Sequence, residues 1–328
     1  MRLERRRRRL RAIRRSRELR SLHDLTRQIS PGDVLLFSTV RNERIRLPYF
    51  LRYYRKLGVG HFLVVDNGSD DGTAEYLCRQ NDVSLWGSKG SYRESQFGAD
   101  WLNYLQNRYA HGHWILVVDP DEFLVFAHCD TRPVQALTDW LDAGNVKSFS
   151  AMLLDVYPGG AVAGATYREG DNPLNVLPYF DAGNYTACEN PRYGNLWIQG
   201  GPRQRAFFAD RPADAPALNK IPLVKWKRGS VYVSSTHMLL PRGYNQVHDR
   251  WGGEKPSGCL LHAKFLPVLK DKATEELERK QHYANGREYK AYLKHGGHEN
   301  SLWTPKSEKY QGWAQLEEFG LMSSGGWI

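Results

Sequence analysis

The feature that most constrains the fold is an alternation of continuous apolar segments of strand length with segments whose apolar residues recur at helical spacing. Continuous apolar strands are typical of sheets buried on both faces. The strand-like segments are 34–40, 61–65, 83–86, 114–118 and 148–156, and the helix-like segments are 46–57, 71–79, 94–110 and 133–143. This order predicts an α/β fold, Rossmann-like, with a mostly parallel sheet flanked by helices.

Acidic residues stand at the ends of two of these strand-like segments. Asp66 directly follows 61–65, and Asp119 directly follows 114–118. Ligands of parallel α/β sheets bind beyond the carboxyl ends of the strands. The sequence therefore predicts a ligand site at this edge, built from at least two separate strands.

The second turn carries three carboxylates, Asp119, Asp121 and Glu122. Carboxylates this close repel one another unless a cation neutralises them. Oxygen ligands suit Mg²⁺ or Mn²⁺, which also bridge the phosphates of nucleotides. An isolated D-x-D pair is more often a solvated turn, but the position directly after a buried strand favours a metal site.

Two further polar turns complete the pattern. Residues 66–73 read D-N-G-S-D-D-G-T, which alone is equally a polar loop, and residues 40–43 read V-R-N-E. Together with the D-P-D-E-F segment at 119–123, these turns resemble the nucleotide-sugar half of bacterial family 2-type inverting glycosyltransferases. The resemblance is strong over 36–126 and continues more weakly through 200–203, 223–226, 236–237 and 261–265.

The resemblance implies a GT-A fold and metal-dependent transfer of a sugar, with inversion, from a nucleotide-sugar donor, expected to be UDP-linked. It implies that Asp66 binds the base, that Asp121 contacts Mn²⁺ or Mg²⁺ directly, and that Asp119 contacts the ribose or a metal-bound water. A late histidine often completes the metal shell in such enzymes; His262 is favoured over His237, and each is equally readily a structural histidine. The residues expected to line the nucleotide pocket or to face the leaving diphosphate are Thr39, Arg41, Glu43, Arg203, Arg205, Lys220 and Lys225.

The chain departs from the family pattern at the catalytic base. Inverting transfer needs a base that takes the proton of the acceptor hydroxyl. Many relatives carry a Glu-Asp pair after a Gly-Gly-aromatic segment, and no such pair follows the glycines at 200–201. Glu189, in a polar stretch before that turn, is favoured over Asp181 and Asp155, so the expected catalytic residues are Glu189 and Asp121.

These features divide the chain into three parts. Glycine, proline and aromatic residues are frequent after residue 157, as in long loops around a site. The expected parts are an Arg-rich tail (1–30), a GT-A domain (31–265, with a nucleotide-sugar half at 31–130 and a loop-rich acceptor half at 131–265) and a C-terminal extension (266–328) with a helix at 270–283.

The basic charge is concentrated in the tail. Residues 1–20 hold eleven arginines and two glutamates, which leaves 35 basic and 34 acidic side chains in the other 308 residues. A nearly neutral body argues against a surface for duplex nucleic acid. The tail is expected to be either a solvated, partly disordered arm or a helix that binds an anionic membrane surface, and to be dispensable for chemistry.

Two alternative functions stay open. One is a nucleotidyl- or phosphosugar-handling enzyme that uses the same acidic edge, and the other is a non-catalytic nucleotide-, sugar- or nucleic-acid-binding protein led by the tail. The strand-end carboxylates favour an enzyme, whose acceptor would be a glycan, a lipid-linked compound or another hydroxyl compound. Four separated cysteines and the lack of a long apolar segment predict a cytoplasmic protein, peripheral on the inner membrane face if the tail binds there.

Overall fold

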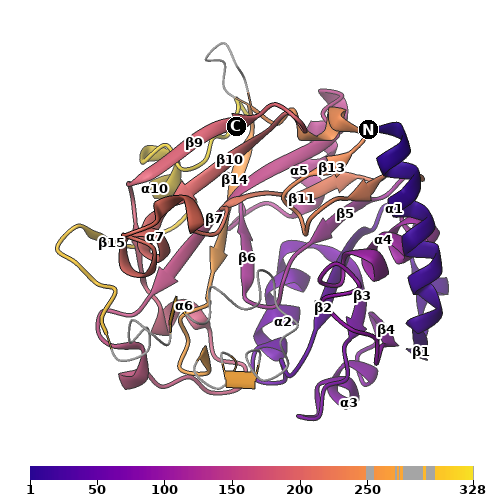
Figure 1. Ribbon diagram of the computed structural model, residues 1–328, viewed down its shortest axis with the longest axis horizontal. Coiled ribbons are helices and arrows are strands. Elements are labelled where there is room, and N and C mark those ends of the chain that lie inside the picture. Colours follow the sequence, from indigo (N-terminus) through magenta and orange to yellow (C-terminus); the bar gives the residue numbers. More distant parts are fainter. Residues whose placement is uncertain (249–254, 270–271, 273, 276–290, 293–299, 328) are drawn as a thin grey trace.

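The computed structural model describes residues 1–248, 255–269, 272, 274–275, 291–292 and 300–327 (Figure 1). One large sheet crosses the molecule in the order β1-β4-β3-β2-β5-β11-β7-β14-β6, with β8 beside β7 and β15 beside β8. Its strands are β1 (Arg20–His23), β2 (Val34–Val40), β3 (Val59–Asp66), β4 (Val83–Gly87), β5 (Trp114–Val117), β6 (Glu122–Val125), β7 (Ser148–Tyr157), β8 (Tyr179–Asp181), β11 (Asn219–Lys225), β14 (Ser257–His262) and β15 (Ser307–Lys309). The α-helices are α1 (Arg2–Arg15), α2 (Leu47–Leu57), α3 (Thr73–Cys78), α4 (Ala99–Tyr109), α5 (Val134–Ala143), α6 (Pro173–Val176), α7 (Gly201–Phe207) and α10 (Trp313–Glu318).

Strand directions separate the sheet into two halves. Strands β4, β3, β2 and β5 are parallel neighbours, and β11 then runs antiparallel between β5 and β7. Beyond it, β14 is parallel to β7, and β6 is antiparallel to β14. The structure confirms the expected α/β class, with a Rossmann-like parallel half of GT-A type flanked by helices.

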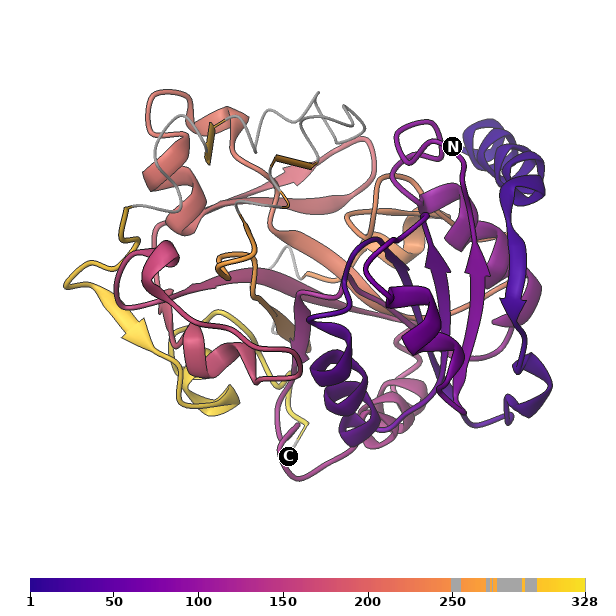
Figure 2. The ribbon, with the colours of Figure 1, turned by 90° about the horizontal axis from the view of Figure 1, so that it is seen from below.

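The helices cover both faces of the parallel half, and the alternating side chains of β2 show why there is a hydrophobic core on each face. Leu35 and Phe37 pack in the same core as Trp101 of α4, whereas Leu36 packs in the opposite core with Phe50 of α2. Because successive strand residues point to opposite faces, one continuous apolar run supplies both cores. Helix α4 therefore covers one face of the parallel half, while α2 and α5 cover the other (Figure 2).

The N-terminal segment differs from the expected solvated arm. Helix α1 packs against α4, and β1 forms the edge of the sheet by pairing antiparallel with β4, with Arg20 opposite Gly87. Acidic residues on the body, among them Asp100, form ion pairs with the inner arginines of α1. The expected boundary at residue 30 therefore does not separate a detached tail from the domain, while the divisions at 130 and 265 stay predictions.

Other parts of the chain also depart from the sequence pattern. Residues 231–240, an apolar segment that could be read as one strand, form a hairpin of β12 (Val231–Tyr232) and β13 (Leu239–Leu240). The part expected to be loop-rich contains a second hairpin of β9 (Tyr185–Asn190) and β10 (Asn195–Gly200). The helix expected at 270–283 lies largely outside the described residues. Within the described part of the chain, no helix has the length and apolar character required to cross a membrane.

Candidate functional site

A cavity of about 610 Å³ opens at the carboxyl ends of β2 and β5, as the strand-end rule predicts. Both halves of the fold line it. Its lining residues include Thr39, Arg41, Glu43, Asp119, Asp121 and Glu122 from the nucleotide-sugar half, and Trp197, Arg203, Lys220, His237, His262 and Lys264 from the rest of the chain. The cavity therefore gathers most of the residues that the sequence pattern selected.

The acidic turn connects β5 to β6, and backbone hydrogen bonds fix its position. The backbone N–H of Glu122 donates to the carbonyl of Asp119 at 3.0 Å, and the N–H of Ala263 donates to the carbonyl of Asp121 at 2.7 Å. Strand β14 lies between β6 and β7, so that His262 is opposite Glu122 on one side and Asp155 on the other. The sheet topology thus brings a late histidine beside the D-x-D turn.

His262 connects two carboxylates. Its Nδ1 atom lies 2.6 Å from Asp155 Oδ1, and its Nε2 atom lies 3.6 Å from Asp121 Oδ2. Asp155 also accepts a hydrogen bond from Arg203 Nε at 2.7 Å, and the side chains of Asp155 and Arg203 are 1% and 4% exposed. The arrangement is a continuous charged chain from Arg203 in the interior to Asp121 at the cavity.

The charges in this chain stabilise one another against burial. Burial opposes ionisation of Asp121, but His262 and Arg46 hold the pKa of Asp121 well below its usual range. Burial likewise opposes protonation of His262, yet Asp121 and Asp155 raise the pKa of its imidazole. Enclosure by the protein and the neighbouring Glu122 raise the pKa of Asp119 to about 7, although its side chain is exposed to the cavity. The carboxylates of this turn therefore oppose one another's ionisation, and Asp119 is only partly ionised near neutral pH.

A buried cation lies beside the same turn. Lys220 Nζ lies 3.0 Å from Glu122 Oε1, and the two side chains are 6% and 2% exposed. Burial opposes the charge of Lys220, but Glu122 and Asp119 raise its pKa above the ordinary value. Lys220 thus faces the acidic turn as an ammonium ion.

The donor atoms fit a divalent cation. Because Asp155 accepts the Nδ1 proton of His262, the Nε2 atom is oriented toward Asp121, which is the arrangement that orients histidine ligands of metals. Mg²⁺ usually takes one or two protein carboxylates and completes its shell with water and substrate phosphates. Among the described residues, no three His, Cys, Asp or Glu side chains form a group able to hold a metal ion, so phosphate and water would supply the other ligands.

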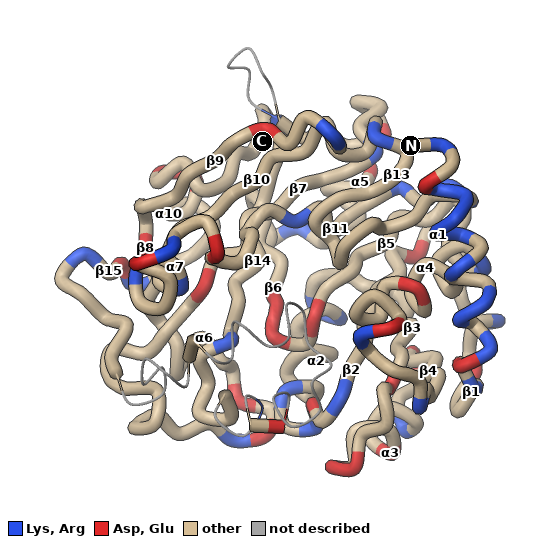
Figure 3. Tube along the Cα trace, viewed as in Figure 1, with Lys and Arg blue, Asp and Glu red and all other residues tan. Residues whose placement is uncertain are grey.

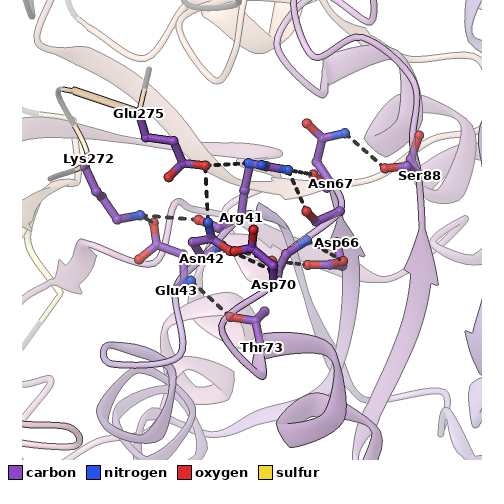
Figure 4. A network of polar contacts seen from close by, with 12 residues as sticks. Arg41, Asn42, Glu43, Asp66, Asn67, Asp70, Thr73, Ser88, Lys272 and Glu275 are labelled. Atoms are coloured by element: carbon purple, nitrogen blue, oxygen red, sulfur yellow. Dashed lines mark hydrogen bonds and ion pairs between the residues drawn. The ribbon is translucent and has the colours of Figure 1, made fainter. Parts of the chain in front are cut away.

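The turn after β2 builds the side of the cavity that belongs to the N-terminal half of the sheet (Figure 4). Arg41 donates to the carbonyls of Asn67 and Gly68 at 2.7 and 2.6 Å, and its Nε lies 2.7 Å from Glu275. Glu43 forms ion pairs with Lys272 and with Arg46. Arg41 and Glu43 therefore line the cavity in contact with residues that sequence reasoning did not select, and their role toward a nucleotide stays a prediction.

Asp66 lies at the end of β3, but it does not line the cavity. It is 4% exposed, and its carboxylate accepts hydrogen bonds from the backbone N–H and the hydroxyl of Ser69. The neighbouring Asn67 lines the cavity instead. In this structure Asp66 shapes the turn, and its predicted contact with a base stays a prediction.

The structure does not bring Lys225 to the cavity. Since β11 runs antiparallel to β5, its last residue lies beside Trp114, at the opposite edge of the sheet from Asp119. There Lys225 Nζ pairs with Asp142 at 2.8 Å. The sequence selected 223–226 only as a weakly matching segment and predicted no strand there. The first half of β11, with Lys220, is the part that reaches the site.

Glu189 and Asp181 also lie outside the cavity lining. Glu189 is exposed on β9 and pairs across the hairpin with Leu196, so it shares a face with Leu196 and not with the cavity-lining Trp197. Asp181 accepts hydrogen bonds from Arg205, which likewise does not line the cavity. The expectation that Glu189 is the base therefore has no geometric support.

His237 lies in the cavity wall on the acceptor side. Its Nδ1 lies 2.6 Å from the carbonyl oxygen of Asn219, and its ring contacts Trp197. Burial and the nearby Lys220 lower the pKa of His237 to about 3. The imidazole of His237 is therefore neutral. It contacts Asn219 and Trp197, whereas His262 is the histidine at the acidic turn.

Sequence reasoning missed several cavity residues. Arg46 is 3% exposed and forms an ion pair with Glu43 at 2.9 Å, but it stands at the start of a predicted helix and gave no separate signal. Lys264 follows His262 by two residues in the weakly matching segment 261–265, which offered an indication. Asp214, in the short helical turn Pro212–Asp214 before β11, lines the acceptor side and had no motif around it.

Comparison with known proteins leaves the family open. No protein-family model and no curated protein matches the chain. Among solved structures, a 4-diphosphocytidyl-2C-methyl-D-erythritol synthase is similar at 15% identity over 53% of this chain and 78% of that chain, with a TM-score of 0.25. A Bacillus anthracis protein described as a glucose-1-phosphate thymidylyltransferase is similar at 7% identity over 88% of this chain and 93% of that chain, with a TM-score of 0.30. Scores this low do not establish a shared function, and the fold assignment rests on the strand order.

Proposed function

We propose that this chain is a metal-dependent glycosyltransferase that moves a sugar from a nucleotide-sugar donor to a hydroxyl acceptor with inversion. The observation that carries the proposal is the convergence of Asp121 and His262, with His262 oriented by Asp155, at the edge of a cavity beyond the parallel strands. A protein that only bound phosphate backbones would not need a buried carboxylate, Asp155, aligned through a histidine with a half-buried one, Asp121. The donor is expected to be UDP-linked and the acceptor a glycan, a lipid-linked compound or another hydroxyl compound.

Each group in the cavity has a role in this proposal. Asp121 and His262 would hold Mn²⁺ or Mg²⁺, with Asp119 beside them. When bound, the cation supplies positive charge that neutralises the diphosphate leaving group. Lys220 is a buried ammonium ion at the same turn and adds preorganised positive charge near the phosphates. Arg41 and Glu43 line the side on which the nucleotide would lie.

We assign the catalytic base to Asp214 in place of Glu189. An inverting reaction needs a base on the acceptor side, because the hydroxyl attacks the anomeric carbon from the face opposite the leaving group. Among the described residues that line the cavity, Asp214 is the carboxylate contributed by the segment between β10 and β11. Its neighbours Ala213, Ala215 and Ala217 also line the cavity, and their small side chains leave room for an acceptor.

A donor panel tests the proposal. The purified full chain is incubated with nucleotide sugars and Mn²⁺, and released nucleoside diphosphate is measured, together with thermal stabilisation by UDP with and without the metal. The matched pair is Asp121→Asn in the cavity and Asp142→Asn, an exposed carboxylate at the opposite edge of the sheet.

We expect UDP release and Mn²⁺-dependent stabilisation in the parent chain and in Asp142→Asn, and neither in Asp121→Asn. Pyrophosphate release from a nucleoside triphosphate and a sugar phosphate would instead identify a nucleotidyltransferase. Stabilisation by UDP with no turnover of any donor would identify a binding protein.

A further inference from the structure

Helix α1 is attached to the body by its charged face. Arg11 Nε lies 2.7 Å from Asp100 Oδ2, Arg15 Nη2 lies 2.9 Å from Glu94 Oε2, and Arg8 Nη1 donates to the carbonyl of Val233 at 2.9 Å. Glu4 accepts a hydrogen bond from Tyr193, which places it on this inner side as well. Helices of soluble proteins usually bury their apolar stripe, and here polar and charged residues face the body.

The aliphatic residues of α1 lie on the opposite side. Leu3, Leu10 and Ile13 are 72%, 58% and 55% exposed. At about 100° per residue they fall within an arc of roughly 80°. Around this stripe lie the exposed arginines Arg2, Arg6, Arg7 and Arg14, whereas the guanidinium of Arg9 lies beside Gly229 of the body.

This outward side carries no acidic residue of α1. Glu4, the acidic residue of the helix, is held by contacts to the body. Figure 3 shows basic segments along most of the length of α1, which lies at one margin of the molecule. We name the outward surface formed by Leu3, Leu10, Ile13 and the four arginines Arg2, Arg6, Arg7 and Arg14 the Leu3–Ile13 face.

Two properties of this face together select its partner. Exposed arginines attract any polyanion, including nucleic acid, but a phosphate-backbone binder gains nothing from a stripe of exposed aliphatic side chains. A lipid bilayer with anionic headgroups accepts both, because aliphatic side chains enter the acyl boundary while arginines reach the headgroups along their flexible stems.

We propose that the Leu3–Ile13 face docks α1 flat on an anionic lipid bilayer. The helix is already folded against α4, so docking requires no folding of a disordered segment. The inner contact of Arg8 is to Val233, which directly precedes the cavity-lining Ser234. Docking would therefore hold one wall of the cavity close to the lipid surface. The proposal does not depend on the reaction assigned above.

The test uses the full chain, because removal of the N-terminal residues would also remove β1 from the sheet edge. Binding is measured by co-sedimentation with vesicles of phosphatidylcholine alone and with added phosphatidylglycerol, at low and high salt. One variant, Arg6→Gln/Arg14→Gln, removes two outward arginines, and its matched control, Arg79→Gln/Arg168→Gln, removes two exposed arginines elsewhere. A third variant, Leu10→Ser/Ile13→Ser, removes the stripe and keeps every charge.

We expect binding to anionic vesicles only, weakened by salt. Loss of each outward arginine should lower the partition coefficient about fivefold, or roughly 25-fold for the pair, and the control pair should bind like the parent chain. Leu10→Ser/Ile13→Ser should bind at least about tenfold more weakly at equal charge. Unchanged circular dichroism would show that α1 remains helical in each variant.

Three results would overturn the proposal. The first is the absence of pelleting with anionic vesicles at low salt. The second is an equal loss in the control pair, which would indicate attraction by net charge alone. The third is a combination of two observations: Leu10→Ser/Ile13→Ser binds vesicles like the parent chain, and the protein binds nucleic acid in a way that requires Arg6 and Arg14. This combination would make the face a binding site for polyanions.

Discussion

The buried carboxylate of Asp155 supports two neighbours, His262 and Arg203, so replacing it with asparagine is expected to have two effects. Asp155 accepts hydrogen bonds from His262 Nδ1 at 2.6 Å and from Arg203 Nε at 2.7 Å, one on each carboxylate oxygen. Asparagine has nearly the same size, but it carries no charge and turns one acceptor oxygen into an amide donor. One of the two donors then faces another donor, so we expect a loss of stability and a loss of metal affinity.

The loss of stability follows from the burial of Arg203. Its side chain is 4% exposed, and Asp155 supplies a counter-charge to it in the interior. Removing one member of a buried ion pair typically costs about 3–5 kcal/mol, because the remaining charge stays desolvated. We expect the free energy of unfolding, measured in urea, to fall by about this amount, which is a large part of the roughly 5–15 kcal/mol of a natural domain.

The loss of metal affinity follows from the orientation of His262. With Asp155 charged, the Nδ1 proton is held and Nε2 is oriented toward Asp121. Loss of such a supporting carboxylate typically weakens metal binding about 10–100-fold. We expect a weakening of this size in Mn²⁺ titrations in the presence of UDP, monitored by calorimetry at a temperature where the variant is folded.

Asp181→Asn is the matched control. Asp181 is also a buried aspartate with an arginine partner, Arg205, at 2.7 Å, but neither residue lines the cavity. Because Arg205 is 26% exposed, we expect a smaller loss of stability and an unchanged affinity for Mn²⁺. Parent-like Mn²⁺ affinity in folded Asp155→Asn, or an equal loss of affinity in Asp181→Asn, would refute the orienting role of Asp155.

Three further predictions follow from the same site. Asp121→Asn should abolish Mn²⁺-dependent UDP binding in a thermal-shift assay while the circular dichroism stays unchanged, and surviving metal-dependent stabilisation would contradict the assignment. Asp214→Asn should lower kcat for transfer about 10²–10⁴-fold with little change in UDP affinity, as expected for loss of a general base, and a parent-like kcat would exclude it. His237, whose pKa is lowered to about 3, stays neutral in the folded chain while the unfolded chain takes up a proton below about pH 6.5. Stability should therefore fall by about 2 kcal/mol between about pH 7 and pH 5 through this residue, and urea titrations of His237→Asn should lack that part of the pH dependence.

The nucleotide-sugar half could be predicted closely because its signals are local. The run 34–40 is β2 as expected, and the helix expected at 46–57 is α2, which ends at Gly58 with a φ of 101° in the left-handed region. Burial on both faces makes each parallel strand uniformly apolar, so its limits are visible in the chain. The strand-end carboxylate Asp119 followed from the same pattern.

The acceptor half could be predicted less well because its partners are not local. Lys225 and Lys220 lie on one strand, and only the antiparallel direction of β11 decides that Lys220 reaches the acidic turn. Glu189 was selected from a polar stretch of sequence, but the pairing of β9 with β10 decides which way its side chain points. The N-terminal helix packs against the body because its arginines form ion pairs with Asp100 and Glu94. No pattern within the N-terminal sequence itself indicates these partners.

By itself, the sequence determined the alternating strands and helices, the acidic turn and the basic charge of the N-terminus, since each depends on residues close together in the chain. Only the tertiary structure decided which histidine joins the site, which carboxylates remain outside it and which side of α1 faces solvent. His262 and Asp155 are separated by 107 positions, and parallel pairing of β14 with β7 places them 2.6 Å apart. The physical reason is that strand order and direction are selected by burial of the whole sheet, whereas the chemistry of a site depends on which strand ends that selection leaves side by side.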